Sequence, residues 1–330
     1  MMHGKVTLED HFAIEATLSD SQPFGPHVWS ELRHRLLDFH DQRLRLMDAS
    51  GVEIMIVSLN APAIQAIENP KQAAEVARQA NDALAQEVAK RPDRFVGLAA
   101  LPMQDAELAI SELRRSIREL GFKGALVNGY SQTPQSGHAI HYDLGQYRPF
   151  WRALTELDVP FYLHPRPPTA GVCSLYDGHP WLLGPTWTFA VETAVHALRL
   201  IGSGLFDELP RLQIILGHLG EGLPFYLWRI DNRNNWMHAP HKYTAKKRVA
   251  DYFRSNFHVT TSGHFSTPAL IDTIAEIGAD RVMFSIDYPF EDFSDAVEWF
   301  DGAQIAEPDR LAIGRTNAMR LFNLQPADAG

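Results

Sequence analysis

Cysteine is almost absent from this sequence, which contains a single one, Cys173, in 330 residues. One cysteine cannot form an intramolecular disulfide, and a zinc site built from thiolates needs several of them. Any metal site must therefore use histidine and carboxylate side chains. The first dozen residues include the polar Glu9, Asp10 and His11, so they lack the apolar stretch of a signal peptide. Both features predict a protein of the reducing cytoplasm.

Long hydrophobic runs and an excess of positive charge are also missing. The apolar runs are strand-sized, as in Leu212–Leu216, which Gln213 interrupts, and none approaches the roughly 18 residues that cross a bilayer. The chain has 30 Lys and Arg residues against 40 Asp and Glu residues, a formal net charge of −10. Nucleic-acid binding needs clustered positive charge. We therefore expect neither a membrane nor a nucleic acid as a partner.

The sequence does contain a repeated alternation of short apolar runs with longer stretches of helical spacing, in a composition that is 45% hydrophobic. Near-continuous apolar runs are typical of strands buried on both faces of a parallel sheet. The predicted strands are Lys5–Glu9, Glu53–Ser58, Phe95–Ala100, Phe122–Val127, Val159–His164, Gln213–His218, Phe257–Ser262 and Arg281–Asp287. The predicted helices are Lys71–Arg91, Glu107–Leu120, Trp151–Leu157, Phe189–Leu205, Pro268–Ile277 and Asp309–Phe322.

Eight strands joined by crossover helices predict an α/β fold, the (β/α)8 TIM barrel, and we expect residues 1–330 to form one domain. The segments 19–40 and 165–187 are rich in proline, glycine and aromatic residues, and we expect long loops over the barrel mouth there. An open doubly wound sheet has the same alternation. Polar residues follow every predicted strand, however, as expected at the carboxyl-terminal mouth of a barrel, and this favours the closed form.

Four of these polar residues suit a metal. Glu9 and His11 lie two positions apart at the end of the first strand, so strand alternation points both side chains into the barrel. His164 and Asp287 end two other apolar strands, where a carboxylate is costly to bury unless it is paired or bound to a cation. Taken singly, each residue also suits a structural role. Together they form a ligand set for one divalent ion, Zn²⁺ or Mn²⁺, with positions left open for water or substrate.

His218 ends a further strand and is either a fifth ligand or a base beside the metal. Glu221 follows three residues later, close enough to orient the imidazole and raise its basicity. A helix cap is the alternative role for Glu221.

Five segments of the chain carry motifs of a known family: Gly4–Phe12, Gly124–Asn128, Asp158–Arg166, Gly217–Glu221 and Phe284–Phe290. On these segments the chain resembles the amidohydrolase superfamily and, within it, the metal-dependent, non-oxidative decarboxylases of aromatic acids. The resemblance extends over almost the whole chain. Hydrolases of the superfamily commonly begin with His-x-His, whereas this chain has Glu-x-His. Many of the decarboxylases have Glu-x-Ala, and His11 instead resembles those that act on 2,6-dihydroxybenzoate, a choice that Ser58–Pro62 and Tyr176–Pro185 support.

The resemblance implies reversible conversion of a small aromatic carboxylate, 2,6-dihydroxybenzoate, to resorcinol and CO₂ with one divalent metal ion and no organic cofactor. It implies that Asp287 delivers a proton to the ring carbon and that His218 with Glu221 sets its protonation state. It also implies that Arg229 reaches the substrate across a subunit boundary in a homo-oligomer, a dimer or tetramer; a surface ion pair is the alternative.

Three more side chains are candidates for substrate contact. Phe24 and Phe290 would form walls for the aromatic ring, with packing in the core as the alternative for both. Asn128 would donate a hydrogen bond to, or accept one from, a ring hydroxyl.

Other functions fit the same fold. A metal-dependent hydrolase or hydratase would use Asp287 to take a proton from water that attacks a carbonyl, and a decarboxylase of another hydroxybenzoate would need only a different pocket. A barrel that serves as a binding or scaffold protein is a third possibility, and it predicts no turnover that depends on metal.

Overall fold

The structure of the protein is a computed structural model that describes residues 1–24, 26–132, 139–236 and 243–325. Its eight strands within these residues follow one another in space in the order of the chain, and all of their pairings are parallel. The strands are β1 (Lys5–Phe12), β2 (Val52–Leu59), β3 (Phe95–Gly97), β4 (Ala125–Asn128), β5 (Phe161–His164), β6 (Ile214–Leu216), β7 (Phe257–Thr260) and β8 (Val282–Met283).

Backbone contacts join the strands into a ring. β1 to β3 form one sheet and β4 to β8 another, and a parallel bridge between Ala99 and Ala125 lies between them. On the other side, the N–H of His11 donates to the carbonyl of Tyr288, just after β8, at 2.6 Å. Sequential parallel order with contacts on both sides is the (β/α)8 architecture expected from the sequence.

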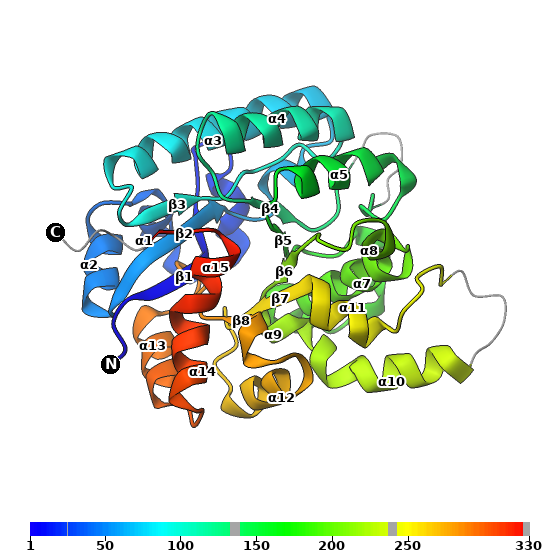
Figure 1. Cartoon of the computed structure of the whole chain (residues 1–330). Helices are drawn as coiled ribbons and strands as arrows, with labels where there is room; N and C mark the ends of the chain where they lie inside the picture. The colour runs from blue at the N-terminus through cyan, green and yellow to red at the C-terminus, as the bar shows by residue number, and fades with distance from the viewer. Residues whose placement is uncertain (25, 133–138, 237–242, 326–330) are drawn as a thin grey trace.

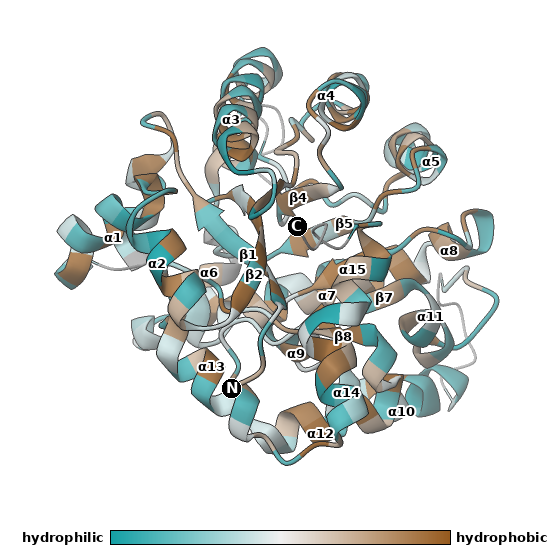
Figure 2. Cartoon of the chain, turned by 60° about the vertical axis from the view of Figure 1, so that its left-hand side comes forward, coloured by the Kyte–Doolittle hydropathy of each residue, from teal (hydrophilic) through white to brown (hydrophobic). Residues whose placement is uncertain are grey.

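Helices surround the strands, as Figures 1 and 2 show. Asn69 and Asp105 cap the two long helices α3 and α4 by accepting hydrogen bonds from backbone N–H groups of the first turn. The helices are α1 (Trp29–Leu37), α2 (Gln42–Ala49), α3 (Pro70–Lys90), α4 (Ala106–Arg118), α5 (Arg148–Glu156), α6 (Ala170–Cys173), α7 (Thr188–Gly202), α8 (Leu205–Glu208), α9 (His218–Glu221), α10 (Leu223–Trp236), α11 (Val249–Asn256), α12 (Thr267–Ile277), α13 (Phe293–Gly302), α14 (Glu307–Leu311) and α15 (Asn317–Leu321).

Two apolar clusters hold this arrangement together. One fills the barrel interior with inward-facing strand residues such as Leu8, Ile56 and Ile215, and it includes Phe322, just after α15. The other lies between the strands and the surrounding helices and includes Val57. Ile56 and Val57 belong to different clusters because successive strand residues point to opposite faces.

The predicted mouth loop 19–40 is partly wrong, because α1 lies within it and α2 follows directly. Leu32 and Leu36 are four residues apart and pack against Ala13 and Leu18, so burial of one helix face outweighs the loop-like composition. The predicted loop 165–187 contains only short helical turns: α6, η5 (Ser174–Tyr176), η6 (Pro180–Leu182) and η7 (Gly184–Thr186).

Most predicted boundaries differ from the structure by one to three residues, and two elements differ more. The strand expected over Arg281–Asp287 pairs only at Val282 and Met283, because the next backbone N–H, that of Phe284, donates to the carbonyl of Ile313. The helix expected over Asp309–Phe322 is divided into α14, the π-helical turn η9 (Ala312–Thr316) and α15.

Candidate metal centre

The end of β1 carries a bulge at Glu9. Leu8 pairs with Ile56 and Asp10 with Val57, so Glu9 has no partner on β2, and its φ is 64°. The extra residue lets Glu9 face the same interior as Leu8 while His11, two residues on, also faces it. The expectation that Glu9 and His11 share one face is met, but through a bulge instead of regular alternation.

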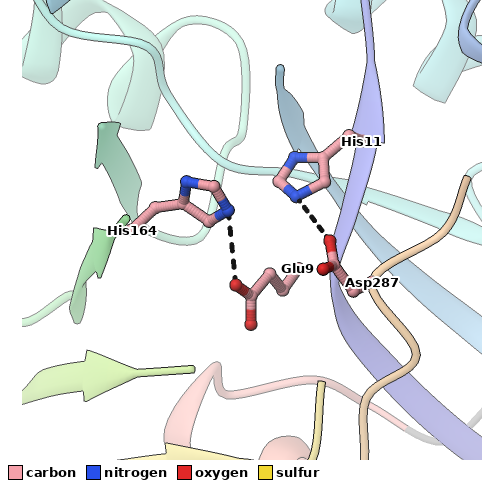
Figure 3. A group of neighbouring side chains, drawn as sticks. All are labelled: Glu9, His11, His164 and Asp287. Atoms are coloured by element: carbon pink, nitrogen blue, oxygen red, sulfur yellow. Dashed lines mark ion pairs between the residues drawn. The ribbon is translucent and has the colours of Figure 1, made fainter. Parts of the chain in front are cut away.

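Four side chains converge at the carboxyl ends of the strands, as Figure 3 shows. Glu9 and His11 come from β1, His164 from the end of β5 and Asp287 from the segment after β8, and their ligand atoms lie within 4.8 Å of one another. Nε2 of His164 is 3.3 Å from Oε1 of Glu9, and Nε2 of His11 is 3.2 Å from Oδ1 of Asp287.

Three of these atoms lack the hydrogen bonds that buried polar atoms normally have. Oε1 of Glu9, Nε2 of His11 and Oδ1 of Asp287 are buried and have no hydrogen-bond partner among the described residues. Unsatisfied atoms of this kind are rare in folded proteins and indicate a missing ion or solvent molecule. Two imidazoles and two carboxylates therefore fit a divalent cation of the Zn²⁺ or Mn²⁺ type.

The second oxygen of Glu9 is held by residues that the sequence analysis did not identify. Oε2 accepts hydrogen bonds from the hydroxyls of Tyr162, Ser262 and Thr260, the last at 3.2 Å. The carboxylate also lies against Gly217, where an added Cβ would be 2.7 Å from Oε2. The alternation of Thr260 and Ser262 along β7 and just beyond it was the only signal for these contacts in the sequence.

Neighbouring groups also fix the imidazole rings. Nδ1 of His164 is 2.9 Å from the carbonyl of Pro165, which can only accept, so this nitrogen carries the proton and Nε2 keeps its lone pair. Burial, aided by the charges of His11 and His218, lowers the pKa of His164 well below its ordinary value. Nδ1 of His11 is 3.3 Å from the hydroxyl of Ser58.

His218 stands beside the four-residue cluster rather than in it. Its Nδ1 is 2.9 Å from Oε1 of Glu221, and its Nε2 is 3.8 Å from both Oε1 of Glu9 and Oδ2 of Asp287. Burial alone would lower the pKa of His218, but the carboxylates of Glu221 and Glu9 raise it well above its ordinary value. The imidazole therefore keeps a proton within reach of Asp287.

The two carboxylate oxygens of Asp287 face different histidines. Oδ1 faces His11 in the ligand cluster, whereas Oδ2 faces His218. Burial alone would raise the pKa of Asp287, but the nearby imidazoles of His11 and His218 lower it to about 2. Burial raises the pKa of Glu9, with the Asp287 charge adding to the rise and His218 opposing it.

Backbone strain is concentrated at this site. Among the described non-glycine residues, only eight have a positive φ, and five of those belong to the site. Such conformations cost about 1–3 kcal/mol each and persist where the surrounding structure enforces them, often at functional sites. The five are Glu9, His218, Leu219, Glu221 and Asp287.

The remaining predicted residues differ in their distance from the cluster. Phe290 makes an edge contact with the ring of His11, with 5.7 Å between ring centroids. Asn128 is buried and donates from Nδ2 to the carbonyl of Asn60 at 3.0 Å, so it holds that turn. Arg229 is exposed on α10 and has no ion pair with a described residue. The side chain of Phe24 lies outside the described part of the structure.

Arg43, on α2, is a further residue that the sequence analysis missed. It is fully buried, and its Nη2 donates to the carbonyl of His11 at 2.7 Å. Its guanidinium lies 4.9 Å from the ring centroids of both Phe39 and Tyr288. It therefore supports two segments that carry metal-ligand candidates, the end of β1 and the segment after β8.

A second group, His141, Glu192 and His196, also brings ligand atoms within 4.8 Å of one another. Burial lowers the pKa of His196 well below its ordinary value, and its Nε2 accepts the N–H of Tyr142 at 3.1 Å. The neutral ring must then carry its proton on Nδ1, so neither nitrogen offers a lone pair to a metal. Nε2 of His141 and Oε1 of Glu192 already form a hydrogen bond with each other at 2.8 Å. These contacts attach the segment around His141 to α7.

The fold and the cluster define a class: (β/α)8 proteins with one candidate metal centre at the carboxyl ends of their strands. The family model described as Amidohydrolase matches residues 17–324, so this chain belongs to the amidohydrolase family. The resemblance inferred from the sequence motifs is confirmed.

Individual relatives are similar over their full length. The curated gamma-resorcylate decarboxylase of Rhizobium sp. (strain MTP-10005) is 62% identical over 327 residues, 99% of this chain and 100% of that protein. The crystal structure of 2,6-dihydroxybenzoate decarboxylase complexed with 2,6-dihydroxybenzoate has a TM-score of 0.96 at 62% identity, covering 98% of this chain and 100% of that one. The dihydroxybenzoic acid decarboxylase of Polaromonas sp. JS666, with bound manganese and the inhibitor 2-nitroresorcinol, has a TM-score of 0.96 at 59% identity, covering 99% of each chain.

Proposed function

We propose that this chain is a metal-dependent carboxy-lyase that converts 2,6-dihydroxybenzoate to resorcinol and CO₂. The observation that carries the proposal is the cluster of Glu9, His11, His164 and Asp287, with its unsatisfied buried atoms, in a chain 62% identical to a gamma-resorcylate decarboxylase. The reaction is reversible, so its direction depends on the supply of CO₂.

The cluster would hold one divalent ion, and Mn²⁺ is favoured because manganese is bound in the Polaromonas relative. Zn²⁺ accepts the same ligands and stays an alternative. When bound, the ion would supply positive charge that fixes the substrate carboxylate and an adjacent phenolate oxygen. The reaction needs no organic cofactor.

Loss of CO₂ requires a proton at the ring carbon that bears the carboxylate. This carbon becomes tetrahedral, the bond to the carboxylate breaks, and the electron pair of that bond restores the aromatic ring as CO₂ leaves. Asp287 is ionised in the free protein, so we assign the delivery to its Oδ2 after this oxygen takes a proton from His218, which it faces, while Oδ1 faces the metal-ligand cluster. His218, oriented by Glu221, replaces the proton.

The first test is to remove bound metal with a chelator, restore Mn²⁺ or Zn²⁺ separately, and follow conversion of 2,6-dihydroxybenzoate by ultraviolet absorbance. We expect turnover to return with the ion and to identify the preferred metal. Stoichiometric metal binding without turnover would contradict the substrate assignment. Other hydroxybenzoates and then hydrolase or hydratase substrates would be tested next.

The proton role is tested by Asp287→Asn, which keeps one oxygen for the cluster. We expect kcat to fall by about 10²–10⁴-fold with the fold intact, the usual contribution of a positioned acid. Asp295→Asn, an exposed carboxylate on α13, is the matched control and should be as active as wild type. An active Asp287→Asn enzyme would remove Asp287 as the donor.

We further propose that Phe290, Phe24 and Asn128 contact the substrate and that residues 1–330 act as one domain. Phe290 is supported by its contact with His11.

The cytoplasmic location stays a prediction from the sequence, and in the described residues no helix is long and apolar enough to span a membrane.

A homo-oligomer, a dimer or tetramer, is the remaining proposal. α10 exposes Phe225, Trp228 and Trp236 at 75%, 72% and 72%, beside Arg229. Large exposed aromatic groups of this kind mark interaction surfaces. Sedimentation analysis of wild type and Trp228→Glu should show an assembly that the charge weakens, and a monomeric wild type would contradict the proposal.

A further inference from the structure

A cavity of about 290 Å³ lies at the opposite end of the barrel from the metal centre. It is lined by residues that directly precede β5, β6 and β8, together with residues of α15. The candidate metal ligands lie at the carboxyl ends of the strands, so the two sites are separated by the apolar barrel interior. Its size is at the lower end of the range for small-molecule pockets.

The cavity gathers positive charge. Arg211, Arg281 and Arg320 line it, and the carboxylates present are those of Asp158 and Asp280. Of these residues, Arg281 and Asp280 form a long ion pair, with 3.9 Å between Nε of Arg281 and Oδ2 of Asp280. Three guanidinium groups against two carboxylates leave an excess positive charge. The mutual repulsion of the arginines would be relieved by a bound anion.

Many N–H donors of these arginines have no partner within the described protein. Nη1 of Arg281 donates to Oε1 of Gln213 at 3.0 Å and to Nε2 of His258 at 3.1 Å. Nη2 of Arg320 donates to the carbonyl of Asp280 at 3.0 Å and to Oδ1 of Asn317 at 3.3 Å. Within the described ranges, the other guanidinium nitrogens of these two residues, and all those of Arg211, donate no hydrogen bond.

His258 adds a buried donor to the cavity lining. It is 4% exposed, and because its Nε2 accepts from Arg281, its neutral ring carries the proton on Nδ1. This Nδ1 is buried and has no partner in the described part of the chain. Burial and the charges of Arg281 and Arg320 lower the pKa of His258 to about 3, so the ring stays neutral.

We propose that this cavity binds a small oxyanion, a phosphate or a carboxylate, between Arg211, Arg281 and Arg320. Guanidinium groups recognise both anions through paired N–H donors. The anion would connect the starts of β5, β6 and β8 to α15, and its effect is on stability rather than on the chemistry at the other mouth. The proposal is independent of the substrate assigned to the metal centre.

The test is calorimetric titration of the metal-loaded full chain at constant ionic strength, with inorganic phosphate and with benzoate as separate probes. The variant is Arg211→Gln with Arg320→Gln, two exposed residues whose replacement preserves the core. The charge-matched control is Arg33→Gln with Arg45→Gln on α1 and α2, which contribute nothing to the cavity. We expect saturable 1:1 binding to wild type and control, and affinity at least tenfold lower in the variant.

The two probes distinguish the source of the oxyanion. Phosphate binding that the variant loses supports a phosphate ligand, and benzoate binding that it loses supports a carboxylate ligand. Equal affinity in all three proteins would place the anion elsewhere, the metal centre included, and would overturn the proposal. Absence of saturable binding of both probes to wild type would overturn it as well. Turnover of the variant should equal that of wild type, since the cavity is remote from the chemistry.

Discussion

Gly217 determines where the carboxylate of Glu9 can lie. An added Cβ would be 2.7 Å from Oε2 of Glu9, and the backbone at Gly217, with φ −72°, is accessible to alanine. Gly217→Ala should therefore act only by displacing the carboxylate. We expect at least a tenfold loss of metal affinity and a corresponding loss of activity, measured by metal titration and by turnover, since misplaced groups near a metal typically cost 10–100-fold.

Gly145→Ala provides the matched control for this substitution. Nothing lies within 4 Å of a Cβ added at Gly145, so the same chemical change meets open space. The control should bind metal as wild type does. Full metal affinity in Gly217→Ala would show that Glu9 adjusts its position freely and is not held as the structure indicates.

At the scale of secondary-structure elements, the strands were predictable because each is a short apolar run that ends in a polar residue. His164, at the end of β5, and Asp287, four residues after β8, could be found for a similar reason, since each ends an apolar run of the sequence. The helix α1 could not be recognised reliably, because the fold and not the local composition buries Leu32 and Leu36.

The finer geometry of the site was not available from sequence pattern. The bulge at Glu9 and the positive φ of His218 and Asp287 are imposed by tertiary contacts, since any single non-glycine residue adopts a positive φ only rarely. The hydroxyl of Tyr162, on β5, reaches Glu9 across the barrel. Contacts between residues over 150 positions apart leave no local signature in a single sequence.

Arg43, on α2, supports the site through hydrogen bonds to backbone carbonyls. Besides the carbonyl of His11, its guanidinium donates to the carbonyls of Asp38 at 2.9 Å and Arg35 at 3.1 Å. Burial raises the pKa of Asp10 to about 7, and the charge of Arg43 opposes that rise. Loss of the guanidinium would leave buried acceptors without donors.

Arg43→Met should lower the free energy of unfolding by about 3 kcal/mol and weaken metal binding, because buried carbonyls lose their donor and the charge that favours the ionised form of the buried Asp10 is removed. Urea unfolding and metal titration measure the two effects. Arg45→Met, on the same helix with a side chain 68% exposed and paired with Asp41, should change stability by less than about 1 kcal/mol. If Arg43→Met were as stable as wild type, the hydrogen bonds of Arg43 would contribute nothing to stability, and its role would be packing alone.

For the molecule as a whole, buried neutral histidines link the fold to pH. Burial lowers the pKa of His164 and of His196 well below the ordinary value, and burial with Arg281 and Arg320 lowers that of His258 to about 3. An unfolded chain binds a proton at each of these positions near pH 6.5. The folded state does not, so acid favours unfolding.

The contribution of His258 follows from its two pKa values. A depressed pKa in the folded state means that the stability is fully present above pH 6.5 and is lost as the pH falls from 6.5 toward 3. Between pH 7.5 and pH 5 the loss is about 2 kcal/mol, at 1.36 kcal/mol per pH unit. His258→Gln should remove this part of the pH dependence in urea unfolding of the protein in phosphate-free buffer. His34→Gln, at an exposed histidine on α1, tests whether the loss of any imidazole has the same effect. If the free energy of unfolding of His258→Gln depended on pH as that of wild type does, the folded protein would protonate His258 as readily as the unfolded chain does. The assignment of a neutral His258 ring in the lining of the cavity would then be wrong.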